Sequence, residues 1–162
     1  MIDAETRALA ERVLDACRAQ GWTLATAESC TGGLVAGALT EIAGSSDVVD
    51  RGFVTYSDAA KMAMLGVPDE TLDTYGAVSE QTAGAMAKGA LERAGVDLAV
   101  SITGIAGPGG GSATKPIGLV HFAAATRQRL IHHEKRYGDV GRSEVRRLSV
   151  TEALSMLHDL AA

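Results

Sequence analysis

Ser29 is the residue whose type and position best suit chemistry. It follows a short strand-like segment, 23–27, and shortly precedes an apolar helical stretch, 34–43. In an α/β sheet this place is the carboxyl edge, where ligands collect. Backbone N–H groups at such a helix start can hold an anion or a developing oxyanion, and glycines leave a ligand room to approach. These groups belong to Thr31, Gly32 and Gly33. The same spacing also fits a serine that only caps the helix.

Lys61 is the candidate base for Ser29, because a serine hydroxyl is a poor nucleophile without one. None of the four histidines sits in a triad pattern, and the sequence around Ser29 is not a G-x-S-x-G elbow. Lys61 lies early in a predicted helix, just beyond a strand, 52–56, that ends at Tyr56. A partly desolvated lysine can lose its proton near neutral pH, and a tyrosine hydroxyl can relay that proton. A solvated helix lysine and an ordinary strand tyrosine are the alternatives.

A glycine-rich loop and two arginines are candidates for holding a phosphate. The loop, 103–112, starts with Thr103 and Gly104 after an apolar strand, and its backbone donors could wrap a phosphate or a ribose. It matches neither G-x-x-x-x-G-K-[ST] nor G-x-G-x-x-G, and a flexible connector is an equally good interpretation. Arg142 and Arg146 share a face at the start of the last helix, where the dipole disfavours cations, which suggests an anionic partner. Pairing with nearby acidic residues explains them equally well.

Composition excludes several classes of protein. The net charge of −5 argues against general nucleic-acid binding, which needs a basic face. Cys17 and Cys30 show no C-x-x-C spacing, so neither a disulfide framework nor a zinc site is expected, and Cys30 is interpreted as a small buried residue. The polar, acidic N-terminus is not a signal peptide, and no apolar run approaches the ~20 residues that span a bilayer. We therefore expect a reduced, cytoplasmic protein that has no metal site and does not bind membranes.

Hydrophobic periodicity predicts how these residues are positioned. Strand and helix alternate early in the chain, and three strands follow one another later, which favours a three-layer α/β/α sandwich with a mixed, mostly parallel sheet of about five strands. We expect one domain, 1–162, whose first helix stops at Gly21 and whose helix at 79–94 is capped by Ser79. The predicted helices are 4–20, 34–43, 57–65, a short piece from 68, 79–94 and 142–160. The predicted strands are 23–27, 52–56, 98–103, 117–126 and, as a charged edge strand, 129–137.

Taken together, several segments resemble the CinA C-terminal domain family, the nicotinamide-nucleotide amidohydrolases. They cover nearly the whole chain in the right order, so the likeness is more specific than any single motif. The segments are 26–33 (TAESCTGG), 43–46 (AGSS), 52–57 (GFVTYS), Lys61, 76–79 (GAVS), 101–110 (SITGIAGPGG), 115–118 (KPIG), and 138–139 (GD) followed by Arg142 and 145–147 (VRR). The resemblance implies the three-layer α/β/α fold.

The same resemblance implies an activity. It is hydrolysis of the amide of nicotinamide mononucleotide to nicotinate mononucleotide and ammonia, without a cofactor. Ser29 would be the nucleophile, assisted by Lys61 and Tyr56.

The family likeness also assigns substrate contacts. Thr103 and Gly104 would hold the substrate, and Arg146, together with Arg142, would hold its phosphate. The family reads Gly-Asp-Arg directly, whereas two residues, 140–141, intervene before Arg142 here. This departure favours Arg146 as the phosphate ligand.

Two other classes of function share some of these features. A non-catalytic sensor of pyridine nucleotides would use the same loops and arginines, but it would give Lys61 no reason to approach Ser29. A phosphoryl-transfer enzyme is less well supported, because no Walker lysine or cluster of acidic metal ligands accompanies the glycine loop. We expect a homodimer, because two-fold dimers are the commonest closed assemblies.

Overall fold

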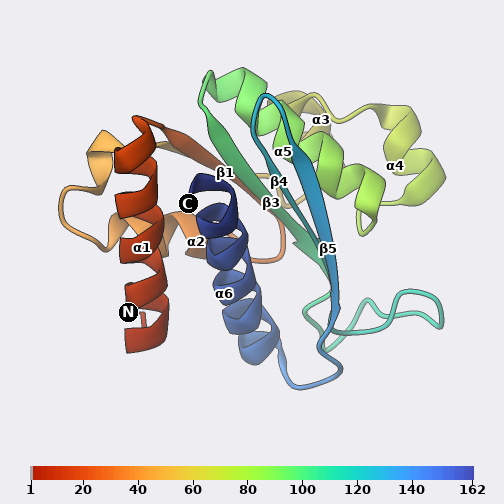
Figure 1. Cartoon of the computed structure of the whole chain (residues 1–162). Coiled ribbons are helices and arrows are strands. Elements are labelled where there is room, and N and C mark those ends of the chain that lie inside the picture. Colours follow the sequence, from red (N-terminus) through yellow and green to blue (C-terminus); the bar gives the residue numbers. More distant parts are fainter. Residues whose placement is uncertain (1) are drawn as a thin grey trace.

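One five-stranded sheet forms the centre of the fold, in the order β2-β1-β3-β4-β5 (Figure 1). The computed structural model describes residues 2–162. β1 is parallel to β2 and β3, whereas β4 is antiparallel to both β3 and β5. Only β4 therefore runs against the other strands, which confirms the predicted mixed, mostly parallel sheet. The strands are β1 (Leu24–Glu28), β2 (Val49–Val54), β3 (Leu98–Gly104), β4 (Leu119–Ala125) and β5 (Leu130–Arg136).

Helices cover both faces of this sheet and complete the predicted three layers. α2 and α6 pack against one face and α5 against the other, while α1 packs on α6 and α2, and α3 and α4 pack on α5. Figure 1 shows α1 beside α6 on the first face and α5 lying across the second. Within residues 2–162 no helix is both long enough and apolar enough to cross a membrane. The helices are α1 (Ala4–Gln20), α2 (Leu34–Thr40), α3 (Asp58–Leu65), α4 (Asp69–Tyr75), α5 (Glu80–Ala94) and α6 (Arg142–Ala161).

Local capping explains where several helices begin and end. The Ser79 hydroxyl accepts a hydrogen bond from the N–H of Thr82 and so caps α5, as predicted, and Ser57 caps α3 in the same way. α1 stops at Gly21, which adopts the left-handed conformation that favours glycine at a helix end. These signals are local, and for that reason the sequence reveals them.

The predicted boundaries needed correction around β2. The apolar pattern placed this strand at 52–56, but pairing with β1 starts at Val49. Asp50 and Arg51 are tolerated inside the strand because β2 is a sheet edge with exposed side chains, and they interrupt the apolar pattern. A short 3-10 helix, η1 (Ser45–Asp47), precedes the strand and was not predicted. The order of the other helices and strands is confirmed, and β5 is an edge strand as expected.

Strand alternation separates two chemically important side chains at the end of β1. Successive side chains in a strand point to opposite faces of the sheet. Glu28, the last residue of β1, bonds to the start of α2 on one face. Ser29 follows it and bonds to α3 on the other face. The Ser29 N–H donates to the carbonyl of Ile102 in β3 at 2.9 Å, which holds the end of β1 to its neighbour.

Candidate active site

A pocket of about 270 Å³ opens at the carboxyl edge of the sheet, where β1 and β3 end. Its size lies near the lower end of the roughly 300–1,000 Å³ that small-molecule sites occupy. The end of β1, the start of α3, the segment 77–78, the glycine-rich loop after β3 and the start of α6 form its walls. Of the residues predicted from sequence, it collects Ser29, Tyr56, Lys61, Thr103, Gly104 and Arg142. Thr31, Gly32, Gly33 and Arg146 do not line it.

Lys61 and Ser29 are in direct contact in this pocket. The Lys61 Nζ lies 3.1 Å from the Ser29 Oγ and 2.8 Å from the carbonyl oxygen of Thr55. Lys61 is only 1 % exposed, although it belongs to the second turn of a surface helix. The alternative of a solvated helix lysine is therefore wrong. The contact joins a hydroxyl to an amine at the distance that proton transfer requires.

Burial changes the pKa of Lys61 in the direction that favours the free amine. Removing the ammonium from water disfavours its charged form, and this desolvation lowers the pKa of Lys61 below its ordinary value of 10.5. The carboxylate of Asp58 acts in the opposite direction and raises the pKa, but its effect is the smaller one. The side chain is therefore closer to a free amine at neutral pH than an exposed lysine is.

Glu28 organises the loop that carries Ser29, and sequence reasoning missed it. Its carboxylate is fully buried and accepts four hydrogen bonds at 2.8–3.1 Å. The donors are the hydroxyls of Thr26 and Thr31 and the N–H groups of Val35 and Ala36. All four partners donate, which suits a carboxylate because its two oxygens only accept. A lone acidic residue in the otherwise uncharged strand 24–28 is the signal that would have found it.

Glu28→Gln should destabilise the protein. The new amide NH₂ would face one of two backbone N–H donors that cannot turn away, so one buried N–H loses its acceptor. We expect the free energy of unfolding to fall by about 2 kcal/mol, measured by urea denaturation. Glu92→Gln, an exposed glutamate on α5, is the matched control and should change little. Unchanged stability in Glu28→Gln would contradict a structural role for the carboxylate.

Because Glu28 caps α2, the alternative in which Ser29 is the helix cap is wrong. The residue at the N-cap position is Gly33, whose φ of 102° is a value that L-residues rarely adopt. This backbone conformation explains why a glycine occupies position 33. The Gly32 N–H donates to the Ser29 carbonyl oxygen, so it serves the turn rather than a ligand. Cys30, directly after Ser29, is the next loop residue that reaches the pocket.

Tyr56 and Arg142 bond to each other at the pocket wall. The Arg142 guanidinium donates to the Tyr56 hydroxyl at 2.6 Å and to the Gly107 carbonyl oxygen at 2.9 Å. Within residues 2–162 no hydrogen bond joins Tyr56 to Ser29 or Lys61, so no bonded path runs from Lys61 through the tyrosine to Ser29.

Arg146, one turn further along α6, points elsewhere. Its Nε donates to the carbonyl oxygen of Cys30 at 3.1 Å. The side chain also lines a separate hollow of about 360 Å³ between the N-terminal ends of α1, α2 and α6. Arg142, and not Arg146, is thus the arginine that the fold brings to the pocket with Ser29.

Thr103 and Gly104 end β3 and line the pocket. The Thr103 hydroxyl donates to the carbonyl oxygen of Ala77 at 2.8 Å, and Ala77 is another lining residue, so this bond joins two parts of the pocket wall. A Cβ on Gly104 would lie 2.9 Å from the carbonyl oxygen of Leu119, so β4 leaves room only for glycine there. The loop beyond Gly104 extends away from the carboxyl end of the strand (teal in Figure 1).

Comparison with known proteins identifies the family. The family model of the CinA C-terminal domain matches residues 6–161 of this chain. The chain belongs to the CinA C-terminal domain family. A crystal structure of competence/damage inducible protein CihA from Agrobacterium tumefaciens superposes with a TM-score of 0.98 at 58 % identity, covering 100 % of this chain and 99 % of that one.

The chain is also similar to family members of different lengths. It is 52 % identical over 159 residues to nicotinamide-nucleotide amidohydrolase PncC of Escherichia coli strain K12, covering 97 % of this chain and 95 % of that protein. A CinA-like protein of Synechococcus sp. strain RCC307 is 51 % identical over 155 residues. The match covers 95 % of this chain but only 37 % of that longer relative.

In this CinA-family chain, Cys30 is buried directly beside Ser29. It is 5 % exposed, and burial raises the pKa of its thiol to about 11, as it also does for Cys17. The reactive thiolate is therefore scarce at neutral pH. We expect neither cysteine to react with iodoacetamide at neutral pH in the folded protein, and activity to survive the treatment. Mass spectrometry checks this, with urea-unfolded protein as the control; rapid labelling of folded Cys30 would contradict it.

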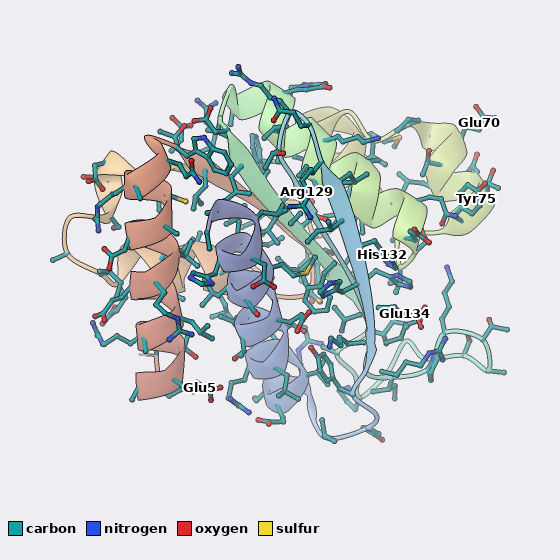
Figure 2. All side chains as sticks on the ribbon, viewed as in Figure 1. Glu5, Glu70, Tyr75, Arg129, His132 and Glu134 are labelled. Carbon is teal, nitrogen blue, oxygen red and sulfur yellow. The ribbon has the colours of Figure 1, made fainter. Side chains whose placement is uncertain are left out.

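The histidines of this family member lie away from the pocket. His121 and His132 bond to each other at 2.8 Å across β4 and β5, and His133 bonds to Glu152. Figure 2 shows His132 on β5, on the same strand as Glu134. Within residues 2–162, no histidine lines the pocket that holds Ser29.

Proposed function

We propose that this protein hydrolyses the carboxamide of nicotinamide mononucleotide to nicotinate mononucleotide and ammonia. The observation that carries the proposal is the 3.1 Å contact between the Lys61 Nζ and the Ser29 Oγ inside a pocket. The name of the Escherichia coli relative supplies the substrate, because that protein is a nicotinamide-nucleotide amidohydrolase and the match spans nearly all of both chains. We also propose that residues 1–162 act as one catalytic domain.

The proposed chemistry is nucleophilic acyl transfer with Lys61 as the base. The free amine takes the proton of the Ser29 hydroxyl while Oγ attacks the carboxamide carbon. The resulting Lys61 ammonium returns the proton to the amide nitrogen, the C–N bond breaks, and ammonia leaves. Water then attacks the acyl-serine ester, with Lys61 taking its proton and passing it to the departing Ser29 Oγ. Nicotinate mononucleotide and the starting enzyme result.

Main-chain and cationic groups of the pocket would hold the charges of substrate and transition state. Cys30 directly follows Ser29 and lines the pocket, so its N–H is the proposed donor to the oxyanion, in place of Thr31 to Gly33. Arg142 is the proposed phosphate ligand, since guanidinium pairs strongly with phosphate. Tyr56, bonded to Arg142, would orient that guanidinium rather than relay a proton.

Ammonia release tests the proposal against the sensor. The purified protein is incubated with nicotinamide mononucleotide, and ammonia and nicotinate mononucleotide are quantified in equal amounts. Stoichiometric release supports the amidohydrolase. Calorimetric binding without any release would support the sensor instead. The buried contact of Lys61 with Ser29 favours catalysis, because binding alone does not need it.

Activity should rise with pH through the pKa of Lys61. The reactive form is the free amine, so kcat/KM is lost as pH falls below that pKa. Because burial lowers the pKa, we expect the midpoint of this acid limb below 10.5. A profile of kcat/KM from about pH 6 to about pH 10 measures it. A rate that does not increase anywhere in this range would contradict an essential free amine.

A further inference from the structure

Asp58 is a charged residue of the pocket that the proposed chemistry does not use. It is the first residue of α3, it is exposed, and it lines the pocket. It lies three residues before Lys61, so the two side chains share one helix face. Within residues 2–162 its carboxylate forms no hydrogen bond and no ion pair.

The presence of Asp58 opposes the activation of the base. Its carboxylate favours the ammonium form of Lys61 and so acts against the desolvation that frees the amine. An acidic residue at the start of a helix gains from the helix dipole, but many positions outside the pocket offer the same gain. A carboxylate in this wall is better explained by a positive charge on the ligand.

Asp58 and Arg142 give the pocket two unlike charges that do not neutralise each other. Arg142 bonds to the Tyr56 hydroxyl and the Gly107 carbonyl oxygen, both of which are uncharged acceptors. A ligand with one cationic and one anionic group would match such a pair. Nicotinamide mononucleotide has this distribution, because its pyridinium ring is positive and its phosphate is negative.

We propose that Asp58 determines specificity for the positively charged ring, while Arg142 holds the anionic end of the same ligand. The inference rests on the proposed function and names the part of the substrate that the pocket selects. The ring is bonded directly to the carboxamide carbon that Ser29 would attack. Its charge would therefore lie near Ser29 and Lys61. Asp58 lines the same pocket, lies one turn before Lys61 on α3 and acts electrostatically on its ammonium.

A pair of ligands that differ in ring charge tests this role. Reduced nicotinamide mononucleotide has the same carboxamide, ribose and phosphate, but its ring is uncharged. Calorimetry in a Ser29→Ala background avoids turnover and compares the two ligands with and without Asp58→Asn. We expect Asp58→Asn to weaken binding of the oxidised form about fivefold and to change binding of the reduced form by less than about twofold.

Asp69→Asn is the matched control, because Asp69 is likewise an exposed first residue of a helix, α4, but lies outside the pocket. It should not change the preference between the two forms. Equal effects of Asp58→Asn on both forms, or no effect on either, would overturn the inference. The inference would also be overturned if Asp58→Asn, introduced into the enzyme that retains Ser29, lowers kcat and leaves KM unchanged. Absence of ammonia release by the wild type would overturn the proposed function alone. The calorimetric comparison of the oxidised and reduced ligands does not depend on turnover and would still measure the preference for ring charge.

Discussion

Ser29→Ala is expected to reduce ammonia release from nicotinamide mononucleotide by more than about 10³-fold, because it removes the hydroxyl that the Lys61 amine contacts in the pocket. Cys30 cannot replace it, since its buried thiol has a pKa of about 11. Binding should survive, because Arg142 and the pocket walls remain. We expect Kd to change by less than about threefold, measured by calorimetry.

Ser155→Ala is the control for this substitution, because Ser155 is also half-buried but lies on α6 outside the pocket. It should retain full activity. Loss of the Lys61 contact should cost Ser29→Ala only about 1 kcal/mol of stability, so an inactive variant remains folded. Substantial turnover by folded Ser29→Ala would refute the covalent mechanism.

Lys61→Met is expected to lower kcat/KM by about 10³-fold, within the range for removal of a general base. Methionine matches the length of the lysine stem and suits a buried site. The carbonyl oxygen of Thr55 loses its donor, but the cost of burying an amine disappears as well. We therefore expect the free energy of unfolding to change by less than about 2 kcal/mol, measured by urea denaturation alongside the rate.

Lys88→Met, an exposed lysine on α5, provides the comparison and should behave as the wild type in both measurements. The acid limb of the pH profile should also vanish from the residual activity of Lys61→Met. If that limb persists with the same midpoint, another group is the base. If Lys61→Met and Ser29→Ala are each inactive, the double variant should be no worse, because the two residues act as a unit.

Much of the fold follows from local patterns that a sequence displays directly. The periodicity of apolar residues located the helices and most strands, and Ser79 and Gly21 marked helix ends, because a cap depends on neighbours a few residues away. β2 was misplaced because an exposed edge strand tolerates charges that hide its pattern. Ser29 was found for a similar local reason, since a strand end followed by glycines and a helix is visible in the sequence.

Tertiary structure alone decided which distant side chains meet. Lys61 is separated from Ser29 by 32 positions and Arg142 from Tyr56 by 86, so only the packing of α3 and α6 against the sheet edge brings them together. Arg142 and Arg146 share a helix face, and the sequence favoured the second. The placement of α6 sends only the first into the pocket. The sequence contains the reactive groups, but the distances between them arise from long-range packing, which local sequence patterns do not determine. The same packing buries Lys61 and thereby lowers its pKa.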